Sequence, residues 1–288
     1  QLERGRVIEG LKALERREHI RRADTDAVVF QNSNVAAIGK HRSDVRAERL
    51  AAGYGIGRNA DVRADAAPGG DGSQAAPYQT IAEALAAVEP DGVIHVMRGT
   101  YPITQQLALT KPGLTIRGSA GAEILLQAPV VPFLLGGGDE TIDGLTMTSD
   151  QAYPLEFIQV AGSGNRILNC DIYGPQQPGD SSTWVVNRGL VTQPGATDIL
   201  VQGCIFHSLR QPAYLNPGSS GTIMHNVCYN TRGYVVVGAD FLFSGNSWGL
   251  PANAVDIALL AGTASGAPYD PLSALEASNS SATISDQR

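Results

Sequence analysis

The sequence predicts an all-β chain that folds as a parallel β-helix, a solenoid in which short strands stack coil upon coil. A phrase recurs between Leu114 and Trp248, in which apolar residues at alternate positions are followed by Gly or Asn. The alternation is typical of a short strand, and Gly and Asn most easily adopt the left-handed conformation of a tight turn. The repeats are 19 to 34 residues long, as in solenoids, whose units bury their apolar faces only by stacking. The phrase includes Gly118, Gly144, Asn169, Gly203, Asn226 and Gly245.

Composition agrees with tight turns around an apolar column, because Gly supplies 33 of the 288 residues and only 17% are charged. The net charge of −7 is unevenly distributed. Residues 1–63 hold 13 of the 21 basic and 9 of the 28 acidic residues, so they carry about +4, and residues 64–288 carry about −11. Opposite charges favour a contact between these parts, within one chain or between chains. The alternative is that no such contact forms and that the basic helix is solvated beside an acidic body.

The first predicted element is a helix over residues 3–22, with a thin apolar stripe among charged residues. Such a helix is marginal alone and needs a partner surface. A short apolar patch follows at residues 28–30. We therefore predict that residues 1–58 form a helical and extended arm, which folds back on its own chain or docks on a neighbouring subunit. Its predicted assembly residues are Val7, Ile8, Leu11, Leu14, Val28, Val29 and Phe30.

The solenoid itself is predicted over residues 59–250 and begins with a turn-rich passage. Thr80 and Glu83 then have the spacing of a capping box, which predicts a cap helix at about residues 80–89. A strand over residues 93–97 follows this helix.

Three phrases at this end carry a family resemblance. They are Asp-Gly-Ser-Gln-Ala-Ala-Pro-Tyr-Gln-Thr-Ile at residues 71–81, Asp-Gly-Val-Ile-His-Val at 91–96, and Gly-Thr-Tyr at 99–101. They resemble the N-terminal module of right-handed parallel β-helices in the pectate-lyase-like superfamily, where an amphipathic helix plugs the first coil. The resemblance covers about residues 60–120, and the recurring phrase extends it to about 250. It implies the fold and no single activity, because the superfamily includes lyases, hydrolases, phage tailspikes, adhesins and non-catalytic surface proteins.

The later elements follow from breaks in the repeat. The longest interval contains residues 175–182, rich in Pro, Gly and Ser, which predict an insertion projecting from one corner. Residues 251–288 leave the pattern and are predicted to form a capping tail, with short helices at 252–260 and 272–277. A cap is needed because an open solenoid end exposes unpaired strands.

Three cysteines are spread over successive repeats. Cys170 and Cys204 each follow a turn residue, so we expect them to stack inside the coil as buried apolar filler. With Cys228 they fit no zinc or redox spacing. No apolar run reaches the length of a membrane span, and the chain begins with Gln1, which leaves export of a processed form open.

The acidic residues and histidines show no spacing typical of a catalytic site. The candidate acids fall at different points of the repeat, whereas a glycoside hydrolase needs two paired carboxylates. His207 and His225 lie near turns without a third ligand. The sequence therefore predicts no catalytic residue, no metal site and no cofactor. The acids considered are Asp143, Glu156, Asp171, Asp198 and Asp240.

The best-ordered polar feature is a series of arginines. Arg188, Arg210 and Arg232 lie 22 residues apart. If they occupy one corner of successive coils, their planar guanidinium groups form a ladder for a polyanion or glycan. The alternative is that each pairs with a nearby acid or carbonyl. Nucleic acid is not an expected partner, because the coils are acidic.

These observations favour a non-catalytic β-helix on an extracellular, cell or virion surface, which forms a homo-oligomer, layer or filament through residues 1–58. The alternatives are a polysaccharide lyase or hydrolase, and a glycan-binding adhesin or tailspike that acts along the β-helix face. Fold resemblance does not decide among these functions.

Overall fold

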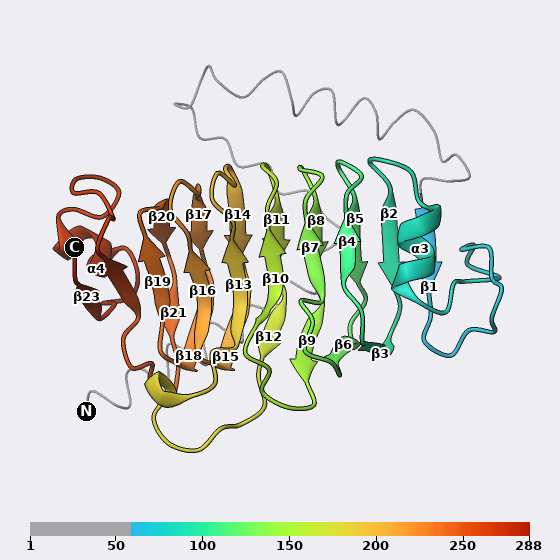
Figure 1. The fold of residues 1–288 in the computed structure, drawn as a ribbon, viewed down its shortest axis with the longest axis horizontal. Helices are drawn as coiled ribbons and strands as arrows, with labels where there is room; N and C mark the ends of the chain where they lie inside the picture. The colour runs from blue at the N-terminus through green and yellow to red at the C-terminus, as the bar shows by residue number, and fades with distance from the viewer. Residues whose placement is uncertain (1–58) are drawn as a thin grey trace, which may run out of the picture.

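The computed structural model describes residues 59–288, which form a parallel β-solenoid with three sheets (Figure 1). The predicted fold class is confirmed. The predicted arm at residues 1–58 lies outside the described residues, and so do its seven assembly residues. Every strand pair in this part of the chain is parallel, and from β2 to β22 the chain visits the three sheets in turn. No helix within residues 59–288 is long and apolar enough to cross a membrane.

We call the three sheets A, B and C in the order in which the chain visits them. Sheet A contains β1 (Asn59–Val62), β2 (Val93–Val96), β5 (Thr115–Gly118), β8 (Thr141–Asp143), β11 (Arg166–Leu168), β14 (Ile199–Gln202), β17 (Ser220–Met224) and β20 (Asp240–Ser244). Sheet B contains β3 (Gly99–Ile103), β6 (Ala122–Leu126), β9 (Thr146–Ser149), β12 (Asp171–Tyr173), β15 (Ile205–Leu209), β18 (Val227–Thr231) and β21 (Ser247–Trp248). Sheet C contains β4 (Leu107–Leu109), β7 (Phe133–Leu135), β10 (Glu156–Val160), β13 (Arg188–Thr192), β16 (Gln211–Leu215), β19 (Tyr234–Val237), β22 (Ile257–Leu260) and β23 (Ile284–Asp286).

The core is a column of apolar side chains inside the coils. On sheet A one inward row is completely buried and joins seven strands in register. Each such buried Ile, Val or Phe contributes about 1.5–3 kcal/mol to stability. The row consists of Ile94, Ile116, Ile142, Ile167, Val201, Ile223 and Phe243.

Most of the turn residues in the recurring phrase lie at the corner between sheets A and B. Gly144, Asn169, Gly203 and Gly245 have φ between 52° and 74°, as predicted for left-handed turn residues. In the coil between Gly203 and Gly245, however, the left-handed residue is His225 (φ 54°), and the prediction for Asn226 is wrong. The prediction for Gly118 is also wrong, because this residue ends strand β5 and is not left-handed.

Asn226 is displaced from the turn because its side chain fills the inward position held by Cys204 one coil earlier. Its Oδ1 accepts the N–H of Cys204, and its Nδ2 donates to Oδ1 of Asn246 at 3.0 Å. The Nδ2 of Asn246 donates in turn to Oδ1 of Asn279 at 2.7 Å. All three amides are buried, so they form a continuous asparagine ladder that satisfies the backbone at this corner.

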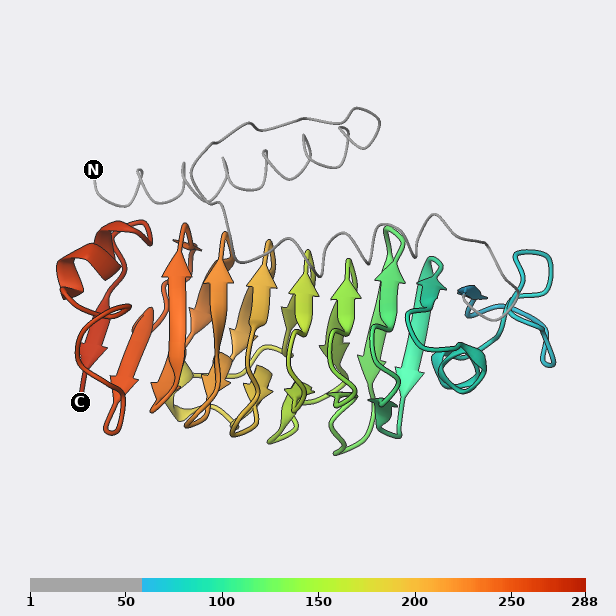
Figure 2. The same cartoon turned by 90° about the horizontal axis from the view of Figure 1, so that it is seen from above.

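The two ends of the solenoid are covered by short helices, as Figures 1 and 2 show. Helix α3 (Ile81–Ala87) begins at the predicted capping box, in which Thr80 and Glu83 exchange hydrogen bonds. Its last carbonyls accept hydrogen bonds from Lys111 Nζ. Ile81 and Ala84 are its buried residues, so the first coil is closed by the helix's apolar face.

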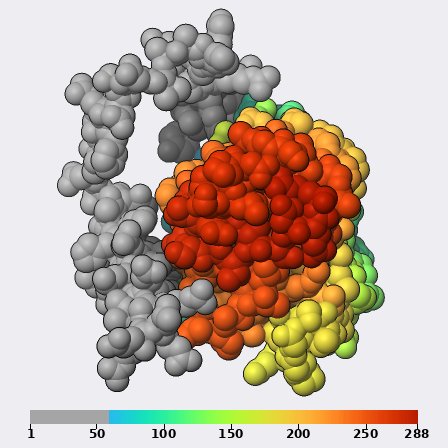
Figure 3. Space-filling model, turned by 90° about the vertical axis from the view of Figure 1, so that its left-hand side faces the viewer, coloured from blue at the N-terminus to red at the C-terminus, as the bar shows by residue number. Residues whose placement is uncertain are grey.

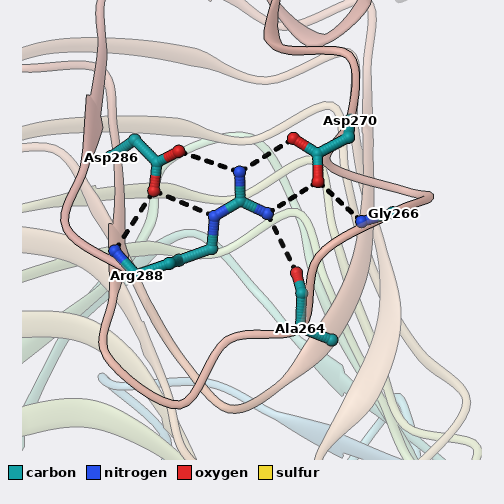
Figure 4. Close-up of polar contacts among 5 residues, drawn as sticks. All are labelled: Ala264, Gly266, Asp270, Asp286 and Arg288. Atoms are coloured by element: carbon teal, nitrogen blue, oxygen red, sulfur yellow. Dashed lines mark hydrogen bonds and ion pairs between the residues drawn. The ribbon is translucent and has the colours of Figure 1, made fainter.

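The tail differs from its prediction in one element. Residues 257–260 form β22 instead of a helix, because Ile257 and Leu259 point into the core and the strand pairs with β19. Helix α4 (Leu272–Ala277) matches the second predicted helix. The tail then adds β23 to sheet C, and Arg288 ties it together by donating to Asp270, Asp286 and the carbonyl of Ala264 (Figure 4).

The predicted insertion lies at the corner between sheets B and C. It joins β12 to β13 and contains a 3-10 helix, η1 (Ser181–Thr183). The indole of Trp184 is buried and donates to the carbonyls of Pro178 and Gly179. Figure 3 shows the insertion, in yellow, protruding beyond the coils.

Candidate functional site on the outer face of sheet B

Two rows of polar and aromatic side chains line the outer face of sheet B. Their neighbours in the strands, such as Ile172 and Phe206, point inward and are fully buried, so the alternate residues face outward. The first row consists of residues that pair from strand to strand, namely Thr100, Glu123, Thr146 and Asp171. The second row, two residues further along each strand, contains Tyr173, His207 and Tyr229.

The second row is a stack of three parallel rings. The Tyr173 and His207 ring centroids are 4.7 Å apart, those of His207 and Tyr229 are 4.8 Å apart, and both interplanar angles are 5°. Each spacing matches the distance between neighbouring strands, so the sheet register produces the stack. Because the faces of the central ring are occupied, the row presents ring edges with polar groups that are held rigidly in place.

The imidazole of His207 is held between two polar partners. Its Nε2 lies 3.7 Å from Asp171 Oδ1, and its Nδ1 lies 3.2 Å from the hydroxyl of Ser208. Burial lowers the pKa of His207, and the charge of Asp171 only partly opposes that effect. His207 is therefore a neutral imidazole at pH 7, with one donor and one acceptor nitrogen.

The two tyrosines keep their protons at neutral pH. Burial raises the pKa of Tyr173, and the negative charges of Glu123 and Asp171 raise it further. Burial, followed by the charge of Asp171, raises the pKa of Tyr229. Both phenols are therefore hydrogen-bond donors beside carboxylate acceptors.

The first row leads toward the N-terminal end of the sheet. Thr100 Oγ1 donates to Glu123 Oε1 at 3.2 Å. Thr100 and Pro102 also line a cleft of about 330 Å³ between α3 and strands β3 and β4. The outer face of sheet B is thus a track of polar side chains that runs from this cleft to Tyr229.

Glu123 and Asp171 are separated by one intervening strand, β9. Two strand spacings place their Cα atoms about 10 Å apart. Inverting glycoside hydrolases are defined by a different distance, because their carboxyl groups lie about 6.5–9.5 Å apart.

The arginine series lies beside this track, at the corner between sheets B and C, but it does not form an evenly stacked ladder. Arg188 pairs with Gln211, and Arg232 donates its N–H to the carbonyl of Arg210. Arg210 is therefore one residue out of register with the other two. The coil that begins at Arg188 is 23 residues long, and the next coil is 21 residues long. Arginines spaced 22 residues apart therefore cannot occupy the same position in every coil.

The other candidate acids and His225 are dispersed. Asp143 lies on sheet A, where it contacts Arg117 at 3.3 Å and accepts from Asn169. Glu156 begins a strand of sheet C, Asp240 begins one of sheet A, and Asp198 is a left-handed turn residue. Only Asp171 and His207, among the acids and histidines considered from the sequence, meet at one place. Within residues 59–288 no three His, Cys, Asp or Glu side chains gather into a metal site.

Sequence reasoning missed Glu123, and it interpreted Tyr173 and Tyr229 as core and stacking residues instead of part of a binding face. The signal for the aromatic row was a constant offset, because Tyr173, His207 and Tyr229 each follow a left-handed residue by four positions. Assigning the turn to Asn226 instead of His225 hid this offset for Tyr229.

No family model matches the chain, and no curated protein matches it. Among solved structures it is similar to the pectate lyase Pel9A, with 13% identity over 72% of this chain and 69% of that chain and a TM-score of 0.39. It is also similar to the GH136 lacto-N-biosidase from Eubacterium ramulus, with 10% identity, 76% and 60% coverage and a TM-score of 0.37. These likenesses concern the fold alone. The sheet topology defines the chain as a parallel β-helix protein.

Proposed function

We propose that this chain binds a glycan along the outer face of sheet B. The observation that carries the proposal is the stacked row of Tyr173, His207 and Tyr229 beside the acidic row that contains Glu123 and Asp171. A solenoid face repeats at each coil, and a linear ligand made of repeating units can follow that repeat.

The polar groups of the track suit a ligand rich in hydroxyl groups. Phenol O–H groups donate, carboxylates accept, and a neutral imidazole does both. The groups are already fixed by stacking, so binding immobilises few side chains and loses little conformational entropy. A polynucleotide is a poor fit, because its phosphates would lie against Glu123 and Asp171.

Hydrolysis of the bound glycan is a second candidate function, suggested by the two carboxylates of Glu123 and Asp171 on one face of sheet B. In an inverting reaction one carboxyl group protonates the leaving oxygen, and the other activates a water molecule on the opposite face of the sugar. The charges of both carboxylates raise the pKa of Tyr173, so this ring lies within electrostatic range of both acids. Detection of reducing ends after incubation separates cleavage from binding alone.

Self-assembly through residues 1–58 stays a prediction, because those residues lie outside the described part of the chain. A glycan ligand agrees with the predicted location on an extracellular, cell or particle surface. A truncation that begins at Asn59 tests the arm separately from the track: if assembly depends on the arm, the truncated chain is a monomer that keeps its glycan binding.

The experiment is a screen of neutral and charged glycans with the full-length chain and the double variant Tyr173→Phe/Tyr229→Phe. The variant keeps both rings and removes only the two hydroxyl donors. Each neutral hydrogen bond contributes about 0.5–1.5 kcal/mol, so losing two should lower the affinity about 5- to 150-fold. Thr222→Ala on the outer face of sheet A is the matched control. Absence of any bound glycan, or a double variant that binds as tightly as the parent, overturns the proposal.

A further inference from the structure

Three guanidinium groups gather at the corner between sheets B and C, next to the glycan track. Arg188 begins β13, Arg210 links β15 to β16, and Arg232 links β18 to β19. Arg210 follows His207 by only three residues, so the corner continues the track.

Arg210 is close enough to Arg188 and to Arg232 for their positive charges to repel. Burial lowers the pKa of Arg188, and the charge of Arg210 contributes. Burial also lowers the pKa of Arg210, followed by the charge of Arg232. Like charges that lie close together destabilise the folded chain unless an opposite charge offsets their repulsion.

No carboxylate within residues 59–288 lies within ion-pair distance of any of the three. Glu156 and Asp180 act on Arg188 and Arg210 only at longer range. Of the alternative that each arginine pairs with a nearby acid or carbonyl, the described part of the chain shows one backbone carbonyl contact, from Arg210 to Trp184.

Neutral contacts hold two of the groups in fixed positions. Arg188 Nε donates to Gln211 Oε1 at 2.7 Å, and its guanidinium lies 5.0 Å from the centroid of the Tyr214 ring. Arg210 Nη1 donates to the carbonyl of Trp184 in the insertion at 2.6 Å.

Several donors at this corner have no partner among residues 59–288. They include the buried Nε of Arg210 and the buried Nδ2 of Asn187, whose Oδ1 accepts the N–H of Arg210. The guanidinium of Arg232 likewise has no hydrogen bond or ion pair there. These are hydrogen-bond donors beside a polar track that lack a partner of opposite charge. Such an arrangement binds an oxyanion.

We propose that this corner binds an oxyanion substituent, a carboxylate or a sulfate ester, on the glycan that occupies sheet B; the choice of ligand rests on the proposed function. One such group would accept hydrogen bonds from Arg210 and Arg232 and relieve their repulsion. The acidic surface of the coils disfavours a densely charged polyanion, so the site fits single substituents on a largely neutral chain.

The test compares dextran, dextran sulfate of low substitution, carboxymethyl dextran and inorganic sulfate as ligands for the full-length chain in titration calorimetry. The variants are Arg210→Gln/Arg232→Gln and the matched control Arg166→Gln on the outer face of sheet A. We expect the double variant to lose at least tenfold in affinity for the charged probes, and the control to lose none. Binding should weaken as salt is raised. Circular dichroism melting verifies that the variants are folded.

The outcomes separate this proposal from the proposed function. If the screened neutral glycans bind sheet B but charged probes bind equally well to the parent and the double variant, the corner proposal fails and the glycan function stands. If inorganic sulfate binds in an arginine-dependent way but no glycan requires Tyr173 and Tyr229, the oxyanion site stands and the glycan function fails. Dextran sulfate and carboxymethyl dextran distinguish sulfate from carboxylate.

Discussion

Glu140 is a carboxyl group in an unfavourable environment, which makes a quantitative prediction possible. It lies at the corner between sheets C and A and is 0% exposed. Its Oε1 accepts the N–H of Gly137 at 3.0 Å, whereas its buried Oε2 has no partner among residues 59–288. Burial raises the pKa of Glu140 to about 7, and the backbone N–H groups of Gly137 and Gly138 only partly oppose this effect.

The raised pKa makes the folded chain less stable as pH rises. Below about pH 4.5 the group is protonated in both the folded and the unfolded state, so it contributes no penalty. Between about 4.5 and 7 the unfolded chain loses its proton while the folded chain retains it, and the free energy of unfolding falls. The gap between these values corresponds to about 3 kcal/mol, fully lost above about pH 7.

The Glu140→Gln variant tests this reasoning because it keeps an oxygen acceptor and cannot ionise. We expect urea unfolding to show the variant gaining about 3 kcal/mol relative to the parent between pH 4 and pH 8. Glu276→Gln, at an exposed position of α4, is the matched control and should show no comparable trend. A stability difference between Glu140→Gln and the parent that does not change with pH would refute the assignment of a buried, protonated carboxyl group.

Three further predictions concern the ladder, the thiols and the tail. Asn246→Ala removes the middle of the asparagine ladder and leaves buried partners unsatisfied, so we expect urea unfolding to show a loss of about 2–4 kcal/mol, against a small change for Thr222→Ala. The buried Cys170, Cys204 and Cys228 should not react with an aromatic disulfide reagent in the native chain and should all react in denaturant; rapid labelling of the native protein would contradict their burial. Arg288→Ala should increase hydrogen exchange around Asp270 and Asp286 at pH 7. That effect should disappear as pH falls toward 2, because Arg288 lowers the pKa of Asp270 to about 2 and the contact is lost on protonation.

Local signals in the sequence were reliable where neighbouring residues alone determine the structure. The capping box at Thr80 and Glu83 is formed within one turn, and the structure contains it. Cys170 and Cys204 follow turn residues at equal offsets, so their predicted stacking inside the coil is confirmed. In each case the position of a residue relative to the nearest turn or helix start decides the result.

Features that depend on register between coils could not be predicted in the same way. Asp171 meets His207 only because the coil between them absorbs the insertion before β13, so sequence separation does not reveal the contact. Residues 257–260 have a sequence compatible with a helix or a strand, and the free edge of β19 selects the strand. The three arginines show the same limit, since one residue of difference in coil length moves Arg210 out of line.

The asparagine ladder also limits how this protein can change its length during evolution or design. The ladder runs from Asn226 through Asn246 to its last member, Asn279, which belongs to the tail. A duplicated coil placed between Asn226 and the tail preserves this continuity only if it brings an Asn of its own. Further toward the N-terminus the same corner holds Leu145 and Cys170, so additional coils there need only a compact apolar residue. Insertion or deletion of a coil should therefore destabilise the fold less in the N-terminal half than between Asn226 and the tail.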